Sequence, residues 1–384
     1  MKIAHIANFY GPTSGGLRTA MHALGAGYLE RGHEMLLVVP GPADADEQTP
    51  YGRRITVRAP IVPFSGGYRV ITRTREVRGI LTGFAPDVLE VSDRTTLRAL
   101  GGWASSHGIP SAFFAHERAD GILHANLPSW LDERLPVEGM ADWHNRGTHR
   151  LFTTVVCTTE YARAEFTRAG LHSVKVPLGV DLERYHPRNA STEVHDRFAA
   201  GAESLVLMAS RLSTEKRPEL AIEAIRILEA RGRSVRLVSA GTGNIAAKMQ
   251  ELAQGLPVTF LGFVTDRELF AGLLASADVV VAPGPIETFG LAALEALASG
   301  TPAVVNAASA LPEVVDDAGV AADGTAEAFA DAIETVLARD ADARRAAARA
   351  RAETMPWSAT IDKMLALHEA ALAAVEKERD HRRQ

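Results

Sequence analysis

Glu287 and Glu295 stand on either side of Phe289-Gly290, and an apolar run follows that pair. The pattern predicts a helix that begins near Phe289 or Gly290, which puts Glu287 in the preceding loop and Glu295 more than a turn inside the helix. A helix N-terminus presents unpaired N–H groups and a partial positive charge, so it favours an anion such as a diphosphate. The flanking carboxylates can accept hydrogen bonds from sugar hydroxyls. The block therefore predicts a site for a sugar nucleotide.

Arg211 and Lys216 lie between the apolar run 204–210 and Pro218, which is typical of a helix start. Two cations at the carboxyl end of a strand can neutralise a diphosphate leaving group. The alternative is a solvated loop in which Glu215 pairs with Lys216. Both interpretations fit the residues.

Gly15 and Gly16 follow the first apolar run and open a helical pattern. Paired glycines at such a turn let backbone N–H groups approach a phosphate closely, although an ordinary strand-to-helix turn fits equally. His116 ends the apolar run 111–115, and this strand-end position favours a site role over a purely structural one. Its surroundings read HExxD, so the HExxH zinc motif is absent.

Two short acidic pairs match a pattern that some enzymes use to hold a divalent metal. Asp44 and Asp46 lie in a predicted loop, and Asp340 and Asp342 lie in an Ala-rich predicted helix. We interpret both pairs as solvated surface, so no metal site is predicted.

Arginines are concentrated between residues 53 and 78, with Glu76 as the acid among them. Within that stretch, residues 68–84 interleave apolar and basic residues in a pattern that predicts a basic amphipathic helix. Arg73, Arg75 and Arg78 would dock on anionic lipid head groups. A solvated helix is the alternative.

The elements that position these residues alternate between short apolar strands and helical patterns, which indicates parallel, doubly wound sheets. A chain of 384 residues exceeds the usual size of one core, so we expect two Rossmann-like domains facing across a cleft. We place the first at 1–190 and the second at 191–357. A last helix, about 358–384, is expected to cross back to the first domain.

The formal net charge of -6 gives no basic field that would hold nucleic acid. Cys157 is the single cysteine, so no intramolecular disulfide can form, which suits a reducing cytoplasm. No apolar stretch reaches the roughly 18 residues that a membrane span requires. We therefore expect a cytoplasmic protein whose membrane contact is peripheral, at the inner face of the plasma membrane.

Taken in order, the Gly-Gly turn, the Arg211/Lys216 pair and the Glu287-x7-Glu295 block resemble the family 4 retaining glycosyltransferases of GT-B architecture. The resemblance covers nearly the whole chain. Its most specific parts are Phe289-Gly290 inside the Glu block and Gly300-Thr301-Pro302 after it; Gly179-Val180-Asp181 looks like the family's linker.

The resemblance implies a role for each candidate residue. Arg211 and Lys216 would hold the diphosphate, Glu287 the sugar hydroxyls, and Glu295 the ribose. Main-chain N–H groups of 289–291 would contact the phosphates, and Gly16 would approach from the first domain. His116 would lie against the transferred sugar. The full set of donor-binding residues is Gly15, Gly16, Arg211, Lys216, Gly262, Phe263, Val264, Asp266, Glu287, Thr288, Phe289, Gly290, Leu291 and Glu295.

Retention in similar enzymes is explained by front-face attack, in which the leaving phosphate helps to deprotonate the acceptor. His116, Glu287, Arg211 and Lys216 would then form the catalytic group, with no metal or other cofactor required. The segments 7–12 and 15–19 look most like actinobacterial enzymes that transfer mannose from GDP-mannose to phosphatidylinositol mannosides or related glycolipids. The alternatives are a UDP-sugar-dependent transferase with a small soluble acceptor, a nucleotide-sugar epimerase, and an idle sugar-nucleotide-binding protein.

Overall fold

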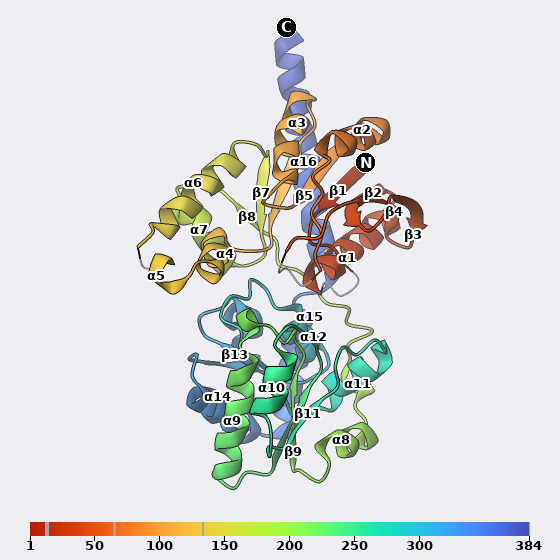
Figure 1. Cartoon of the computed structure of the whole chain (residues 1–384). Helices are drawn as coiled ribbons and strands as arrows, with labels where there is room; N and C mark the ends of the chain where they lie inside the picture. Colours follow the sequence, from red (N-terminus) through yellow and green to blue (C-terminus); the bar gives the residue numbers. More distant parts are fainter. Residues whose placement is uncertain (12–14, 64–66, 133, 384) are drawn as a thin grey trace. The chain divides into compact units, whose positions relative to one another are not determined.

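The computed structural model describes residues 1–11, 15–63, 67–132 and 134–383, so that Pro12 of the segment 7–12 lies outside the described residues. The chain forms two compact units (Figure 1). One consists of Met1–Leu178 with Trp357–Gln384, and the other of Gly179–Pro356. The final helix thus belongs to the first unit, as expected from the sequence.

The first unit is built on an eight-stranded sheet in the order β3-β4-β2-β1-β5-β6-β7-β8. Its described pairs are parallel except for β3 with β4. The strands are β1 (Lys2–Ala7), β2 (Glu34–Gly41), β3 (Ala45–Thr49), β4 (Gly52–Arg58), β5 (Val88–Ser92), β6 (Ser111–Ala115), β7 (Thr154–Cys157) and β8 (Val174–Lys175).

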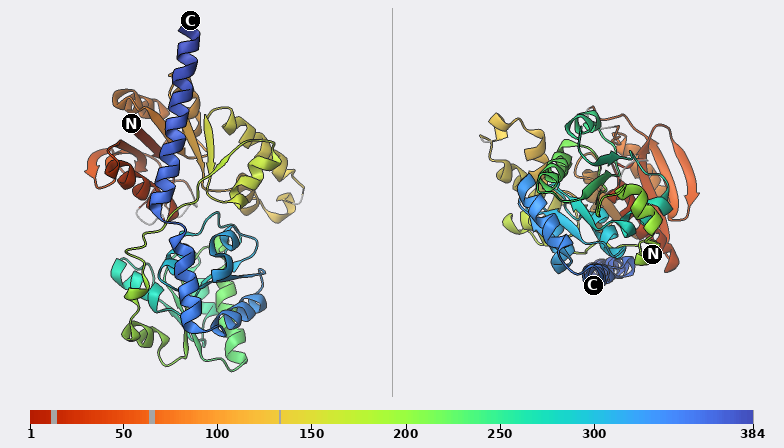
Figure 2. Two further views of the ribbon diagram at one scale, coloured as in Figure 1. Left: turned by 180° about the vertical axis from the view of Figure 1, so that it is seen from behind. Right: turned by 90° about the horizontal axis from the view of Figure 1, so that it is seen from below.

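Helices cover both faces of this sheet, because its strands are apolar on both sides and must be buried on both. The helices α1 (Gly16–Glu30) and α16 (Trp357–Arg383) supply Met21, Leu24, Ile361 and Met364 to one face (Figure 2). The opposite face receives α2 (Thr74–Phe84), α3 (Leu100–Ser106) and α7 (Glu160–Arg168). The remaining helices are η1 (Leu97–Ala99), α4 (Ala119–Asn126), α5 (Ser129–Asp132) and α6 (Val137–His149).

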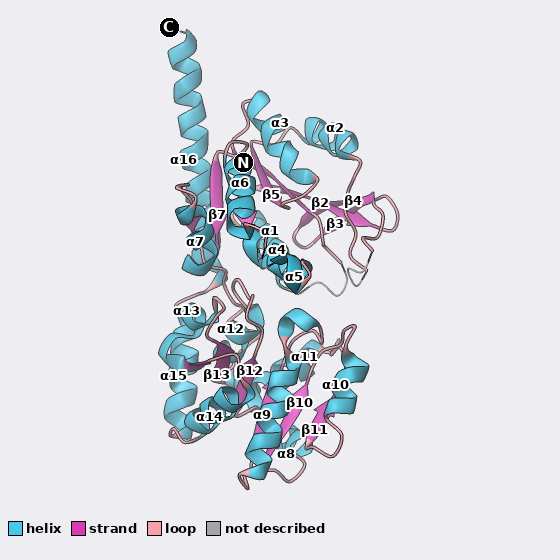
Figure 3. Ribbon diagram, turned by 60° about the vertical axis from the view of Figure 1, so that its left-hand side comes forward, coloured by secondary structure: helices cyan, strands magenta, loops and turns pink. Residues whose placement is uncertain are grey.

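The second unit contains a parallel six-stranded sheet in the order β11-β10-β9-β12-β13-β14, seen in Figure 3. The strands are β9 (Ser204–Met208), β10 (Val235–Ser239), β11 (Val258–Phe260), β12 (Val279–Ala282), β13 (Ala303–Asn306) and β14 (Gly319–Ala322). Each half is thus a doubly wound α/β sheet, and the predicted fold class is confirmed.

Helices again cover both faces of the second sheet. One face receives α9 (Pro218–Ala230), α10 (Ala246–Leu252) and α14 (Ala326–Leu337). The other receives α8 (Thr192–Ala199), α11 (Arg267–Ser276) and α12 (Leu291–Ala298). The remaining helices of the unit are η2 (Pro187–Asn189), η3 (Thr214–Lys216), α13 (Leu311–Val315), η4 (Asp316–Ala318) and α15 (Ala341–Glu353).

The two units divide between Leu178 and Gly179, whereas the sequence placed the boundary near residue 190. The segment that looked like a linker is held to the second unit by its backbone. Val180 N–H donates to the Met355 carbonyl at 3.0 Å, and Arg349 donates to the carbonyls of Leu182 and Tyr185. These bonds place residues 179–190 with the second unit.

The basic helix expected over residues 68–84 begins only at Thr74. Residues 69–71 are extended instead, because their backbone groups bond to neighbouring segments: Phe9 N–H donates to the Arg69 carbonyl, and Ile71 N–H donates to Asn8 Oδ1 at 2.8 Å. The apolar side chains of Ile71, Val77 and Leu81 are fully buried in the core. The apolar side of this segment is therefore occupied by the unit itself.

The Ala-rich helix predicted around Asp340 and Asp342 is interrupted, and the structure has two helices there, α14 and α15. A new helix starts after Asp340, because the Asp340 carboxylate accepts a hydrogen bond from Ala343 N–H at 2.9 Å and so acts as the N-cap of α15. Among the described residues, no helix combines the length and the apolar character that a membrane crossing requires.

Candidate functional site

Lys216 and Glu287 form an ion pair in the second unit. Lys216 ends η3, after β9, and Glu287 lies in the loop that joins β12 to α12. Both strands are parallel and adjacent, so their carboxyl ends meet at one edge of the sheet. The side chains are 20% and 23% exposed, so the pair keeps a solvent-facing side. The structure therefore brings together two of the predicted donor-binding residues.

A cavity of about 30 Å³ adjoins this pair and is lined in part by Ser210, Lys216, Glu287, Gly290 and Leu311. That volume suits one or two waters and is far too small for a nucleotide. A ligand that contains a sugar and a diphosphate must therefore bind on the solvent-facing side of the Lys216–Glu287 pair, at the surface of the unit.

Arg211 pairs with Glu215 at 3.2 Å, and Ser213 also donates to that carboxylate, at 2.6 Å. The solvated-loop interpretation assigned Glu215 to Lys216, whereas the structure gives Glu215 to Arg211 and Glu287 to Lys216. Arg211 is 47% exposed, so its guanidinium remains accessible beside this ion pair.

Gly290 is the residue that lets the chain turn into α12. It has φ +76°, a left-handed conformation that side chains rarely adopt, and a Cβ there would lie 2.2 Å from Leu311 Cδ2. The helix begins at Leu291, one residue after the expected start. Its first N–H groups have no intrahelical partner, so they provide the anion-binding end expected beside Thr288 and Phe289. The Phe289 side chain itself is buried and packs in the core.

Glu295 lies inside α12 and faces Tyr185. Burial raises the pKa of Glu295 to about 7, and the hydrogen bond from Tyr185 only partly offsets this effect. Tyr185 is held in place by Arg349, which donates to its carbonyl at 2.9 Å. A carboxyl poised near neutrality can either accept from or donate to a ribose hydroxyl.

The segment 262–266 follows β11, at the same edge of the sheet as Arg211. Gly262 has φ +69°, and Phe263 is 50% exposed. Asp266 is occupied as the N-cap of α11, because its carboxylate accepts from Glu268 N–H at 2.9 Å and Leu269 N–H at 3.1 Å. An exposed aromatic ring at this position could stack on a base, whereas Asp266 serves the helix.

Gly15 and Gly16 stand at the start of α1 in the first unit, with Gly15 as its N-cap residue. A Cβ on Gly15 would meet no atom of the unit within 4 Å. The protein fold alone therefore does not require glycine at Gly15. Close approach of a ligand to the backbone would supply a reason for it.

His116 follows β6 and donates or accepts at Nε2 with Ser92 Oγ, at 2.8 Å. Loss of hydration around the ring lowers the pKa of His116 to about 3, with smaller contributions from His5 and Arg94. The imidazole is therefore neutral at physiological pH.

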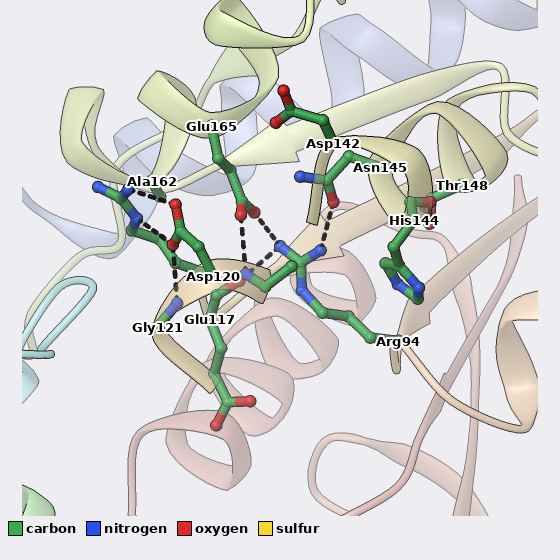
Figure 4. Close-up of polar contacts among 12 residues, drawn as sticks. Arg94, Glu117, Asp120, Gly121, Asp142, His144, Asn145, Thr148, Ala162 and Glu165 are labelled. Carbon is green, nitrogen blue, oxygen red and sulfur yellow. Dashed lines mark hydrogen bonds and ion pairs between the residues drawn. The ribbon is translucent and has the colours of Figure 1, made fainter. Parts of the chain in front are cut away.

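The backbone after His116 is fixed by a buried polar network (Figure 4). Arg94 donates to the carbonyl of Glu117 at 2.5 Å, to Asn145 Oδ1 at 2.8 Å and to Glu165 Oε1 at 2.5 Å. The second oxygen of Glu165 accepts from Ala119 N–H at 2.7 Å. Figure 4 shows Arg94 and Glu165 pointing toward each other from loop and helix. This network ties the loops after β5 and β6 to α6 and α7.

Three of the four acids in the two acidic pairs have structural partners. Asp44 accepts from Arg58 N–H and from Arg73, and Asp46 pairs with Arg53 at 2.6 Å. Asp340 caps α15, as described above. The described residues contain no group of three or more His, Cys, Asp or Glu side chains with the geometry of a metal site.

All three arginines proposed for lipid contact are exposed, but they differ in their ion pairs. Arg73 pairs with Asp44 at 2.7 Å and with Glu76 at 3.1 Å. For Arg75 and Arg78, no ion pair is found with any acid in the described part of the chain. The charge of Arg73 is thus already balanced by two nearby acids, whereas no such acid was found for Arg75 and Arg78 in the described part of the chain.

Sequence reasoning missed several residues that shape these sites. Gly241 and Gly243 follow β10, and a Cβ on either would lie within 2.1 Å of the carbonyl oxygen of Ser210 or Leu212. They let the Arg211 loop approach β10 closely, and the Gly-x-Gly spacing after a strand is the signal that could have found them. No sequence pattern marked Tyr185 as a residue of the site.

Comparisons with known proteins cover both units. Residues 192–353 match the family model "Glycosyl transferases group 1", and residues 15–179 match "Glycosyl transferase 4-like domain". Among curated proteins, the chain is 46% identical over 369 residues to the GDP-mannose-dependent alpha-(1-6)-phosphatidylinositol dimannoside mannosyltransferase of Mycobacterium tuberculosis (strain ATCC 25177 / H37Ra), covering 95% of each chain.

Solved structures show the same fold at low sequence identity. Sucrose-phosphate synthase from Thermosynechococcus elongatus has a TM-score of 0.77 and 20% identity, covering 97% of this chain and 100% of that one. Anabaena HepE in complex with UDP and glucose has a TM-score of 0.72 and 18% identity, covering 96% of this chain and 99% of that one. The family models and the mycobacterial relative are all glycosyltransferases, so they argue against the epimerase alternative. The chain belongs to the family 4 glycosyltransferases of GT-B fold.

Proposed function

We propose that this glycosyltransferase transfers α-mannose from GDP-mannose to a phosphatidylinositol mannoside or a related glycolipid. The observation that carries the proposal is the 46% identity, over 95% of both chains, with a mycobacterial enzyme named for that donor and for a phosphatidylinositol dimannoside acceptor. At such identity and coverage, a change of donor base and acceptor class together would require a rebuilt site.

The geometry of the second unit supports a sugar-nucleotide donor. Lys216 and Arg211 supply positive charge at the edge of the sheet where α12 presents its N-terminus. Glu287, already bonded to Lys216, has further acceptor capacity for sugar hydroxyls. Charge on a departing diphosphate would be stabilised by these cations and by backbone N–H groups, with no metal.

We further propose that the sugar is transferred with retention by front-face attack, which the same arrangement supports. The diphosphate oxygen, held beside Lys216, would take the proton of the acceptor hydroxyl as the bond to the anomeric carbon breaks. Glu287 would hold the sugar and stabilise its developing positive charge without forming a covalent intermediate. His116 would lie against the transferred sugar, and Glu295 would bind the ribose.

The lipid acceptor implies peripheral contact with an anionic membrane at the cytoplasmic side. On the first unit, Arg75 and Arg78 on α2 are suited to this contact because both are exposed and extend their charge into solvent. The apolar face of α2 packs in the core, so contact would be electrostatic and would not involve insertion of the helix.

The proposal is tested by product analysis. The purified protein is incubated separately with GDP-mannose, GDP-glucose, UDP-glucose and UDP-galactose, each with phosphatidylinositol dimannoside in detergent micelles or with free inositol phosphate. We expect an α-mannosylated lipid from GDP-mannose alone, identified by mass and by the anomeric proton coupling. Turnover of a UDP-sugar on the soluble acceptor, with none from GDP-mannose, would overturn the donor and acceptor assignments.

A further inference from the structure

Arg349 of α15 is bonded to two separate segments of the second unit. Its Nη1 donates to the Leu182 carbonyl at 3.2 Å and to the Tyr185 carbonyl at 2.9 Å. The same nitrogen donates at 2.8 Å to the carbonyl of Ala298, the last residue of α12. Its Nε donates to Glu353 at 2.8 Å, and the Arg349 side chain is 17% exposed. One largely buried guanidinium thus fastens the segment around Tyr185 to the carboxyl end of α12.

Residues 181–185 form a compact turn, which we call the Tyr185 turn. Tyr185 N–H donates to the Asp181 carbonyl at 2.9 Å. The Asp181 carboxylate accepts from Glu183 N–H at 3.2 Å and from Arg184 N–H at 2.9 Å, the bonding of an Asx turn. Because these bonds join the ends of the turn, the position at which Arg349 holds two of its carbonyls also sets where its side chains lie.

The side chains of the Tyr185 turn lie beside Glu295. The ring of Tyr185 packs against the apolar cluster that contains Ala296, the neighbour of Glu295 in α12. The Tyr185 phenol hydrogen-bonds to the Glu295 carboxylate. Burial has the largest effect on the pKa of Glu295, and the other groups that act on this pKa are Tyr185, Arg184 and Asp181, all in the turn. The turn therefore forms one wall of the surroundings of Glu295.

The contact with Tyr185 leaves the Glu295 carboxylate able to accept further hydrogen bonds. A carboxylate has two oxygens with about four lone-pair positions, and one phenol uses one of them. Glu295 is half-buried, so part of its side chain is open to a ligand. A carboxylate that is already held in one orientation loses less conformational freedom on binding than a mobile one. Tyr185 thus prepares Glu295 for a ligand.

A second arginine of α15 shows the same chemistry without this connection. Arg345, one turn before Arg349, donates to the carbonyls of Ala275 and Ala277 at the end of α11. Such bonds satisfy the last carbonyls of a helix and place a cation at its negative end. Arg349 does the same for α12, but two of its three carbonyls belong to the Tyr185 turn.

We infer that Arg349 is a positioning residue for the donor: it holds the Tyr185 turn against α12, so that Tyr185 keeps Glu295 oriented toward the ribose hydroxyls of the sugar nucleotide. The inference rests on the proposed function for the contact between Glu295 and the ribose. Arg349 would not touch the donor, and the diphosphate contacts of Arg211 and Lys216 would not depend on it. Arg349 should therefore control the preference for a ribose over a sugar without those hydroxyls.

The first test compares the binding of GDP and 2′,3′-dideoxy-GDP by titration calorimetry. UDP and 2′,3′-dideoxy-UDP are titrated in parallel, because the ribose contact does not depend on the base. In the unmodified protein we expect the ribose form to bind about 10- to 100-fold more tightly, as hydrogen bonds to a charged group would give. Arg349→Met keeps the length of the side chain without its donors and should reduce this preference by about 3- to 10-fold.

Two further variants separate positioning from helix capping. Arg349→Lys returns a charge and N–H donors and should recover part of the preference for ribose. Arg345→Met is the matched control, because it removes carbonyl bonds from the same helix without affecting the Tyr185 turn. It should keep the preference of the unmodified protein. If Arg349→Met weakens the ribose and dideoxy forms equally, as a general loss of structure would, the inference is overturned. Thermal unfolding midpoints show how much structure each variant loses.

The second test asks whether Arg349 acts through Tyr185. Tyr185→Phe should lower the preference for ribose by itself, because the phenol no longer orients Glu295. In that background Arg349→Met should cause little further loss, since both changes remove the same contact. Independent, additive losses from the two changes would mean that Arg349 acts by another route and would contradict the inference.

A third measurement needs no nucleotide. Carbon NMR of the full chain labelled with ¹³C at the glutamate carboxyl follows the titration of Glu295, whose signal is identified by its loss in Glu295→Gln. We expect a midpoint near pH 7 in the unmodified protein. Arg349→Met should move the midpoint higher, because the hydrogen bond from Tyr185 favours the ionised carboxylate. Arg345→Met should leave it unchanged. An unchanged midpoint in Arg349→Met would refute the positioning of Tyr185.

The outcomes separate the inference from the proposed function. If the unmodified protein binds neither ribose nucleotide more tightly than its dideoxy form, the ribose contact of Glu295 fails, while the NMR midpoint still decides whether Arg349 holds Tyr185 on Glu295. If the uridine pair binds and the guanosine pair does not, the donor base was assigned wrongly and the uridine pair tests Arg349. A preference for ribose that is equal in Arg349→Met and the unmodified protein would refute the role of Arg349 alone.

Discussion

The carboxylates buried in the first unit differ from those at the edge of the second. Glu90 and Glu165 are completely buried, and each contacts polar groups of its own unit through both oxygens. Glu287 and Glu295 are partly exposed, and the contacts found for their carboxylates in the described chain are Lys216 and Tyr185. The first pair has its acceptor capacity used by the fold, whereas the second keeps capacity for a ligand.

The pKa values express the same difference. At Glu90 the partners outweigh burial, so the pKa is lowered and the carboxylate is stable inside the protein. At Glu295 burial outweighs the single partner, so the pKa rises to about 7. A carboxyl that its own unit solvates poorly gains more from a polar ligand than one already surrounded by donors. Incomplete pairing is thus a better guide to the binding site than burial.

The largest effect on stability is expected for Glu165→Ala. It would leave Arg94, 10% exposed, without its carboxylate in the interior, and removal of one partner of a buried ion pair costs about 3–5 kcal/mol. Urea denaturation measures the loss. Glu160→Ala, an exposed acid at the start of the same helix, is the control and should cost less than about 1 kcal/mol. Equal losses of stability in the two variants would show that the buried Glu165 carboxylate contributes no more than the exposed Glu160 carboxylate.

The largest effect on activity is expected for Glu287→Gln. The amide keeps the shape but loses the charge that would stabilise the sugar, so kcat should fall by about 100-fold, which corresponds to about 3 kcal/mol. Nucleotide affinity should change little, because Arg211 and Lys216 remain. Steady-state kinetics and titration with GDP measure the two quantities. Glu313→Gln, in α13, is a control; unchanged turnover in Glu287→Gln would refute its placement at the sugar.

A pH-dependent effect is expected for Glu295. Its folded pKa of about 7 lies above the ordinary value of 4.5, so the folded state binds the proton more tightly than the unfolded chain. The contribution of the protonated Glu295 carboxyl to folding stability is therefore fully present below pH 4.5 and is lost as the pH rises through 7. Glu295→Gln cannot ionise and should therefore exceed the unmodified protein in stability by about 1–2 kcal/mol at pH 8, after allowance for partial exposure.

Thermal unfolding of both proteins at pH 5 and pH 8 tests this expectation. The two curves should converge at pH 5 and separate at pH 8. Tyr185→Phe provides a second check, since loss of its hydrogen bond should raise the pKa of Glu295 further. A variant that is less stable than the unmodified protein at pH 8 would show that the carboxylate is well solvated.

Much of the fold could be predicted because its strands are short apolar runs between turn residues. The apolar run 111–115 coincides with β6, the run 204–210 contains β9, and Pro218 marks the start of α9. Strands β3 and β4 were missed because polar residues such as Asp46 and Arg53 pair across an exposed edge and leave no apolar pattern.

The candidate site was less predictable. The Glu287 block follows from local spacing, because a helix start and its flanking acids are close in sequence. The contacts that define the acids are long-range: Lys216 meets Glu287, and Tyr185 meets Glu295, only after the strands have paired. His5 and Glu90 were polar residues inside apolar strands, a signal that indicates burial with a partner but does not name it.

The smallest effect is expected at the surface, where the same distinction between used and available charge applies. Arg73 is already paired with Asp44 and Glu76, so Arg73→Ser should not change binding to vesicles containing anionic lipid. Arg75→Ser with Arg78→Ser should weaken it by about threefold at 0.15 M salt, because screened surface charges contribute little each. Vesicle sedimentation measures the partition, and Arg197→Ser with Arg267→Ser on the second unit controls for net charge. An equal loss in the control pair would mean that binding follows net charge and not the α2 surface.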